Sequence, residues 1–215
     1  MARRLRNHDY HEELNIYTAF TDLMSNAFVI LILFLLLAMV TSFMNNNVGL
    51  TDTPPIIVIQ DEGAYRFASG SATIPQAMFN YISQQIVPEI ESRTQEYNIN
   101  IVEIIGHTDG QPNGNLTSNL DLNLEDVASG TLPVGKLQAG SNADLGLMRA
   151  LAIVQVLRNI QVNEQRLKGL SFRAYSAAQL ILPSGEFAAI ARQEDQTRRR
   201  IEIRFTRLGK VQEVK

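Results

Sequence analysis

Asp22 is an acidic residue at the edge of the most apolar stretch of the chain, and a carboxyl group in that position can bind and release a proton. An ionisable group near membrane hydrocarbon is costly unless it faces protein or water, so it is a functional candidate by default. In a helix, Ser25 and Asn26 lie on the same side and form a small polar strip with it. The alternative is structural: Asp22 lies among lipid headgroups or stabilises the positive end of the helix dipole.

A second set of residues combines an acid and a base in two separated blocks. The segment GHTDGQ at 106–111 places Asp109 after a strand-like run, and Asn142, Leu145 and Arg149 follow at helical spacing. An acid and a base held close together can bind a zwitterion, because a guanidinium pairs with a carboxylate in bidentate fashion. The alternative is that Asp109 caps a turn and Arg149 lies on a helix surface without a ligand.

The apolar stretch must position Asp22. Ala27–Val40 is an unbroken apolar run, and Leu23–Phe43 extends to about 31 Å as a helix, enough to cross a hydrocarbon core of about 30 Å. A cleaved signal peptide has a shorter apolar region and a small-x-small cleavage site, and a helix that is apolar all round needs a very large core if it is buried. We therefore expect a single transmembrane helix.

The flanking charges predict the orientation of this helix. Arg3, Arg4 and Arg6 precede it, whereas Arg66 is the first cation that follows. The positive-inside rule then places the N-terminus in the cytoplasm and the remainder of the chain across the membrane. The helix is expected to contact lipid, with the C-terminal domain on the far side of the membrane.

The composition excludes several classes of protein. The 215 residues carry a net charge of −3, which argues against a nucleic-acid partner, since such binders normally show a strong basic excess. The absence of cysteine excludes disulfides, thiolate metal sites, cysteine nucleophiles and anchoring through a lipid-modified cysteine. We find no nucleophile–base pair, metal-ligand constellation or cofactor motif, so the sequence predicts a protein that is not an enzyme and holds no metal or cofactor.

The remainder of the chain alternates strand and helix patterns, which predicts an α/β domain with helices on a face of one sheet. Expected strands are 56–60, 65–68, 99–105, 170–175 and 200–205, and expected helices are 71–97, 143–159 and 186–193. Residues 111–141 show no sustained period and are expected to be a long loop. The basic run at 198–200 is expected to begin the last strand opposite an anionic polymer.

Three separate sequence motifs together resemble the pattern of a known protein family. In chain order they are GHTD at 106–109, NxxLxxxRA at 142–150 and RRIEI at 199–203. Together they resemble the OmpA-like peptidoglycan-binding domain that outer-membrane anchors and flagellar stator B subunits share. The chain departs from that pattern because Gly146 replaces the usual serine, RAYSAA at 173–178 replaces a Gly-x-Gly turn, and the insertion at 111–141 is unusually long.

The resemblance implies a ligand and a role for each residue of the second set. Asp109 would bind the ammonium, and Arg149 the carboxylate, of the diaminopimelate residue in a peptidoglycan stem peptide. Asn142 and Leu145 would shape the same pocket. The resemblance therefore implies that peptidoglycan is a partner of this chain.

The layout as a whole resembles stator B subunits, and FTDLMSNAFVILILFLLL at 20–37 is similar to the helix of the B subunit of the Zorya anti-phage defence system. This implies a homodimer inside a ring of MotA-like A subunits, with Asp22 as the proton-binding residue of the channel. It also implies a bacterial inner membrane, with the C-terminal domain in the periplasm. The alternatives are a flagellar-type stator B subunit and a passive tether between inner membrane and cell wall. The expected parts are a cytoplasmic tail (1–21), a transmembrane helix (22–43), a linker (44–55), the OmpA-like domain (56–207) and a C-terminal tail (208–215).

Overall fold

The computed structural model describes residues 6–47 and 54–209, with side chains for 16–43 and 54–209. It divides into two compact units, Met1–Asp52 and Thr53–Lys215. Arg3 and Arg4, on which the expected orientation partly depends, lie outside the described residues. So do residues 48–53 of the expected linker and 210–215 of the expected tail.

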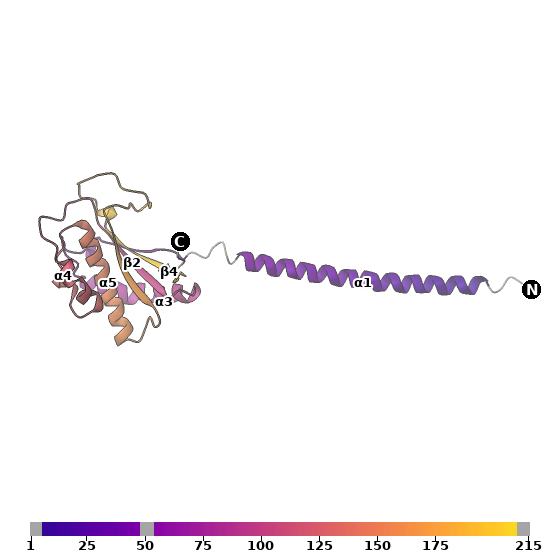
Figure 1. Cartoon of the computed structure of the whole chain (residues 1–215). Helices are drawn as coiled ribbons and strands as arrows, with labels where there is room; N and C mark the ends of the chain where they lie inside the picture. The colour runs from indigo at the N-terminus through magenta and orange to yellow at the C-terminus, as the bar shows by residue number, and fades with distance from the viewer. Residues whose placement is uncertain (1–5, 48–53, 210–215) are drawn as a thin grey trace, which may run out of the picture. The chain divides into compact units, whose positions relative to one another are not determined.

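The described part of the first unit is one continuous helix, α1 (Arg6–Asn47), drawn in indigo and violet in Figure 1. Its segment Ile16–Phe43 is long and apolar enough to cross a membrane, and its side chains are exposed. The expected span 22–43 lies within that segment. At about 1.5 Å per residue, α1 is roughly twice as long as a hydrocarbon core is thick, so it extends beyond the apolar span.

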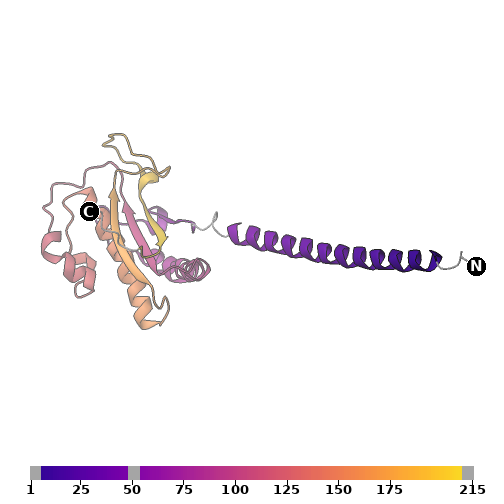
Figure 2. The same ribbon diagram turned by 45° about the vertical axis from the view of Figure 1, so that its right-hand side comes forward.

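The second unit is built on a four-stranded mixed sheet with the strand order β1-β4-β2-β3 (Figures 1 and 2). The strands are β1 (Ile57–Gln60), β2 (Ile101–His107), β3 (Ser171–Ala178) and β4 (Arg200–Thr206). β2 and β3 are parallel, whereas β4 is antiparallel to both β1 and β2. A parallel pair needs a crossover connection, and the segment between β2 and β3 supplies it.

Helices cover one face of this sheet. α2 (Gln76–Tyr81), the π-helical turn η2 (Ile82–Ile86) and α3 (Val87–Glu96) follow one another, and α5 (Asn142–Asn163) makes the crossover from β2 to β3. Their apolar side chains meet alternate residues of the strands, such as Val102, Ile104, Ile201 and Ile203. The α/β fold class and the apolar N-terminal helix that the sequence predicts are confirmed.

The opposite face of the sheet is charged, because side chains of a strand alternate between faces. His107, Arg200, Glu202 and Arg204 project from β2 and β4 on this side. Arg200 and Arg204 donate hydrogen bonds to the two carboxylate oxygens of Glu202. Burial lowers the pKa of His107, with the charge of Arg200 as a further cause.

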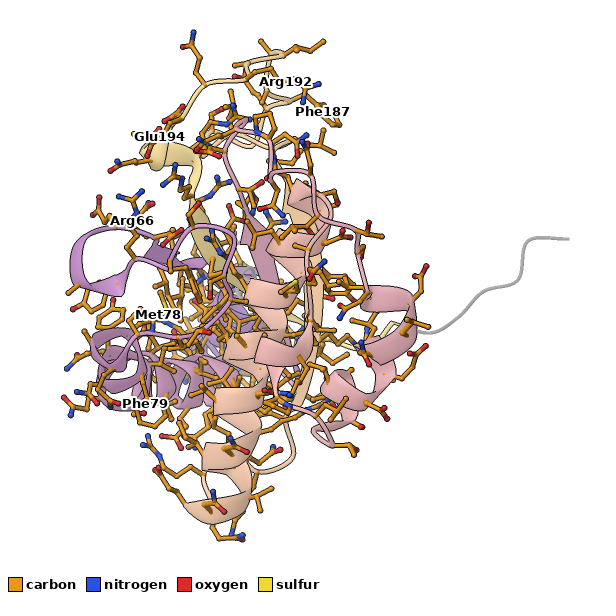
Figure 3. All side chains as sticks on the ribbon, turned by 90° about the vertical axis from the view of Figure 1, so that its left-hand side faces the viewer. Arg66, Met78, Phe79, Phe187, Arg192 and Glu194 are labelled. Carbon is orange, nitrogen blue, oxygen red and sulfur yellow. The ribbon has the colours of Figure 1, made fainter. Side chains whose placement is uncertain are left out.

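Three sequence-based expectations about local structure are wrong. Residues 65–68 form no strand, because the side chain of Asp61 accepts the Phe67 N–H that a ladder would use, and a 3₁₀ turn, η1 (Gly63–Tyr65), precedes it. Residues 186–193 form no helix, because the N–H of Leu182 and the C=O of Glu186 close a hairpin instead. The protruding loop that results carries Phe187 and Arg192 (Figure 3).

The third correction concerns the insertion at 111–141, which is not one long loop. It contains α4 (Leu120–Ser129) and the short η3 (Val134–Lys136). Leu120 and Val127 are buried, and with residues of α5 they form a second apolar cluster. The insertion is therefore a packed part of the domain. Its packing can hold the residues at its start, from Gln111 onward, in fixed positions.

Candidate functional site

The acid and base expected to form a site line one cavity of about 420 Å³. Asp109 follows the C-terminal end of β2, while Asn142, Leu145 and Arg149 lie in the first two turns of α5. The volume lies within the range of small-molecule sites, about 300–1,000 Å³. The fold thus brings together all four residues that the resemblance selects in this domain.

Asp109 is buried and held by a partner that sequence reasoning missed. Its Oδ2 accepts hydrogen bonds from Nε and Nη2 of Arg199, at 2.9 and 2.7 Å, and from the N–H of Asp195 at 3.2 Å. Its Oδ1 accepts one bond, from the N–H of Gln111 at 3.2 Å. Since a carboxylate oxygen can accept two bonds, Oδ1 keeps capacity for a donor on a ligand.

Arg149 is also buried and also has an acidic partner. Its Nη1 donates to Oδ2 of Asp61 at 2.9 Å, and its Nε donates to the carbonyl of Ser71 at 3.1 Å. Its guanidinium lies 4.8 Å from the centre of the Phe67 ring. No described residue accepts a hydrogen bond from Nη2, so this donor group is available to a ligand in the cavity.

Thr108 adds an unpartnered polar group to the same cavity. Its side chain is buried and lines the cavity beside Asp109, yet its hydroxyl has no hydrogen-bond partner among the described residues. Leaving a buried hydroxyl unpaired costs about 1–3 kcal/mol. The hydroxyl oxygen itself is enclosed by protein, so it offers no direct contact to a ligand in this structure.

Asn142 and Leu145 contribute to the shape of the cavity. Nδ2 of Asn142 donates to the carbonyl oxygens of Asp109 and Gln111, at 3.3 and 2.9 Å, and so joins the start of the insertion to the start of α5. Leu145 belongs to the second apolar cluster. The helix begins at a Ser141 cap, whose hydroxyl accepts the N–H of Asp144 at 3.2 Å.

The charges around the cavity balance. Two acids, Asp109 and Glu194, line the cavity with three bases, Arg66, Arg149 and Arg199. A third acid, Asp61, pairs with Arg149 without lining the cavity itself. Burial lowers the pKa of Arg149, and the charge of Asp61 opposes this change. Burial also disfavours the charge of Arg199, but its hydrogen bonds to Asp109 raise its pKa overall. A neutral cavity with separate cationic and anionic groups suits a ligand that carries both charges.

The basic run at 198–200 is buried within the domain, and its expected position opposite an anionic polymer stays a prediction. Arg198, Arg199 and Arg200 are all buried, and each donates hydrogen bonds within the domain. Arg199 reaches the cavity, while Arg200 pairs with Glu202 on the other face of the sheet. Arg199 is the first residue of the RRIEI block, so the sequence could have marked it as a candidate site residue. No sequence feature indicated that it pairs with Asp109.

Gly146 lies where α5 passes very close to the sheet. A Cβ at this position would lie 2.9 Å from the carbonyl oxygen of Gly106 in β2 and would overlap the hydroxyl of Ser176 in β3. Ser176 therefore occupies the space that a side chain at position 146 would need. The lack of a side chain at Gly146 and the presence of Ser176 opposite it are sterically coupled.

We expect Gly146→Ala to lower the free energy of unfolding by about 1–3 kcal/mol, because it overpacks this crossing. The double variant with Ser176→Gly should lose less than the two single variants together, since it removes the clashing hydroxyl. Urea unfolding of the four proteins measures this coupling. Gly135→Ala is the control, since nothing lies within 4 Å of a Cβ there. Strictly additive losses of stability would contradict the steric coupling between positions 146 and 176.

The three residues expected to act in the membrane lie on α1. Asp22, Ser25 and Asn26 are three and four residues apart within a continuous helix, which places them on one side of it. All three side chains are exposed in the single chain. The proton-binding role of Asp22 stays a prediction.

Comparisons with known proteins give similarities to solved structures alone. Neither a protein-family model nor a curated protein sequence matches the chain. The periplasmic domain of Helicobacter pylori MotB is 20% identical, with 73% of this chain and 82% of that chain covered and a TM-score of 0.38. The cell wall anchor of the T6SS from Pseudomonas aeruginosa is 17% identical, with 76% and 94% covered and a TM-score of 0.36.

A third solved structure is the OmpA-like domain of FopA1 from Francisella tularensis. It is 12% identical, with 72% of this chain and 75% of that chain covered, and the TM-score is 0.34. At these identities the likeness concerns the fold and assigns no ligand or partner to this chain.

Proposed function

We propose that this chain anchors a membrane complex to peptidoglycan by binding the diaminopimelate residue of a stem peptide in the cavity of its C-terminal domain. The observation that carries the proposal is the arrangement of Asp109 and Arg149, two buried and oppositely charged side chains in one cavity. The free end of diaminopimelate carries an ammonium beside a carboxylate. The ammonium donates to Oδ1 of Asp109, and the carboxylate accepts from Nη2 of Arg149.

Internal ion pairs prepare both groups for this ligand. Arg199 fixes one oxygen of Asp109, and Asp61 fixes one nitrogen of Arg149. Holding the two groups in place before binding reduces the entropy lost when the complex forms. The similarity of the GHTD, NxxLxxxRA and RRIEI blocks to peptidoglycan-binding domains supports the same ligand.

The experiment is co-sedimentation of the full chain, in detergent, with purified diaminopimelate-type peptidoglycan. We expect Asp109→Asn to weaken binding roughly tenfold or more, because it removes the charge that meets the ammonium. Asp121→Asn makes the same chemical change on the exposed side of α4 and serves as the control. Equal sedimentation of Asp109→Asn and the wild type would contradict the proposed site.

We further propose that the chain is the B subunit of a proton-driven inner-membrane motor, namely the motor of the Zorya anti-phage defence system. In this proposal α1 crosses the membrane once with its N-terminus in the cytoplasm, and two copies lie inside a ring of A subunits. Asp22 binds the proton that drives rotation. An acid with Ser25 and Asn26 on one side of an otherwise apolar span supports this role.

Two other functions fit the same layout. A flagellar-type stator B subunit would use Asp22 in the same way, whereas a passive tether would grip the wall and move no ions. In each case the protein binds and anchors without catalysing a reaction on its ligand, so we propose that it is not an enzyme. A protection assay against phage and a motility assay separate the two motors.

A further inference from the structure

Arg66 stands at the rim of the cavity, in a position fixed by its neighbour. The next residue, Phe67, donates its N–H to Oδ1 of Asp61 at 2.6 Å, and its ring lies against the guanidinium of Arg149. The backbone at 66–67 is therefore tied to the same ion pair that holds Arg149. Both arginines line the one cavity.

Arg66 is the most weakly paired of the three arginines around the cavity. Its hydrogen bond among the described residues runs from Nη2 to Oε1 of Glu194 at 3.4 Å, with the two side chains 45% and 48% exposed. Figure 3 shows Arg66 and Glu194 on neighbouring segments at the same edge of the domain. A long, exposed ion pair of this kind is readily replaced by another partner.

Glu194 does not depend on Arg66. Its carboxylate also accepts a hydrogen bond from Nη2 of Arg199 at 2.9 Å. The hydrogen bond from Arg199 is the main cause of the lowered pKa of Glu194, and the charge of Arg66 is a minor cause. Arg66 can therefore turn to a ligand while Arg199 keeps the charge of Glu194 compensated.

We propose that Arg66 binds a second carboxylate of the ligand, the free α-carboxylate of the glutamate that precedes diaminopimelate in the stem peptide. This inference rests on the proposed binding of diaminopimelate in the same cavity. In stem peptides this glutamate is linked through its γ-carboxyl, so its α-carboxyl is either free or converted to an amide. A guanidinium pairs strongly with a carboxylate, and an amide has no charge to offer it.

The charge balance leads to the same assignment. In the proposed complex the diaminopimelate zwitterion uses Asp109 and Arg149, so a further carboxylate needs another cation. Arg149 and Arg199 are each held by a buried acid, at 2.9 and 2.7 Å. Arg66 is paired with Glu194 alone among the described residues, and Glu194 is already paired with Arg199, so Arg66 can meet the extra charge. The domain would thus select walls whose stem glutamate is not amidated.

The test measures binding of two synthetic tripeptides to the full chain in detergent by calorimetry. The tripeptides contain alanine, glutamate or its α-amide, and diaminopimelate, and differ at the α-carboxyl alone. We expect the wild type to bind the acid form roughly tenfold more tightly than the amide, the factor of one charge-assisted hydrogen bond. Arg66→Gln should bind both forms with the affinity that the wild type shows for the amide.

The control variant is Arg192→Gln, which removes an exposed arginine from the neighbouring loop, outside the cavity (Figure 3). It should keep the preference for the acid form. Equal binding of the two tripeptides by the wild type, or a preference that survives in Arg66→Gln, would overturn the inference while leaving the proposed function standing. Binding of neither tripeptide would overturn both.

Discussion

Arg149→Met is expected to abolish binding to peptidoglycan and to lower the free energy of unfolding by about 3–5 kcal/mol. The side chains of Arg149 and Asp61 are 6% and 3% exposed, so the variant leaves a buried carboxylate without its cation. Methionine fills much of the volume of the arginine stem, which limits the loss from packing. The loss of binding follows from the loss of the donor that meets the ligand carboxylate.

A second substitution separates the two effects. Asp61→Asn in the Arg149→Met background removes the unpaired charge, and we expect it to restore a large part of the stability and none of the binding. Urea unfolding and peptidoglycan co-sedimentation of the same preparations measure both quantities. Arg173→Met, on an exposed position of β3, is the control for loss of an arginine. If the double variant still sediments with peptidoglycan, Arg149 does not bind the ligand.

Asp22→Asn is expected to eliminate the activity of the motor while assembly and peptidoglycan binding stay intact. The two side chains have nearly the same shape, but an amide binds no proton in the physiological range. The measurement is protection against phage in cells that carry the complete system, with the level of the assembled complex checked by co-purification. Loss of protection with a normal complex supports the motor.

The matched control is Asp9→Asn, the same chemical change in the part of α1 that precedes the apolar span. It should protect cells as well as the wild type does. Full protection or motility with Asp22→Asn would instead favour a passive tether. Loss of the complex itself would assign Asp22 a structural role and contradict its role in proton binding.

The meeting of Asp109 and Arg149 could be predicted from the sequence, whereas their partners could not. The GHTD and NxxLxxxRA blocks place an acid at the end of a strand and a base on the following helix, and a crossover helix must pack on that strand. Arg199 meets Asp109 because β4 pairs antiparallel with β2, and Asp61 follows β1, which pairs with β4 on its other side. An apolar pattern indicates which face of a strand is buried, but it does not indicate which strand lies beside it.

The insertion and the loop before β4 show a second limit. α4 has apolar residues at helical spacing, Leu120, Leu124 and Val127, but it is only ten residues long, and the exposed Leu122 interrupts the pattern. Residues 186–193 have helical composition, yet their backbone groups are used in a hairpin. In both segments tertiary contacts outweigh the local pattern. The long elements β2, α5 and β4 are rich in apolar residues along their whole length, and their predicted ends lie within a few residues of the observed ones.

The position of β1 at the edge of the sheet has a mechanical consequence. In the proposed anchor, tension from the N-terminal part of the chain would enter this domain at Ile57, and the ligand would hold the domain beyond the other end of the strand, where Asp61 pairs with Arg149. Hydrogen bonds between antiparallel strands lie across the strand direction, so tension along β1 loads its bonds to β4 in shear and all at once. The force that this anchor withstands is thus set by four residues of one strand and the ion pair that follows them.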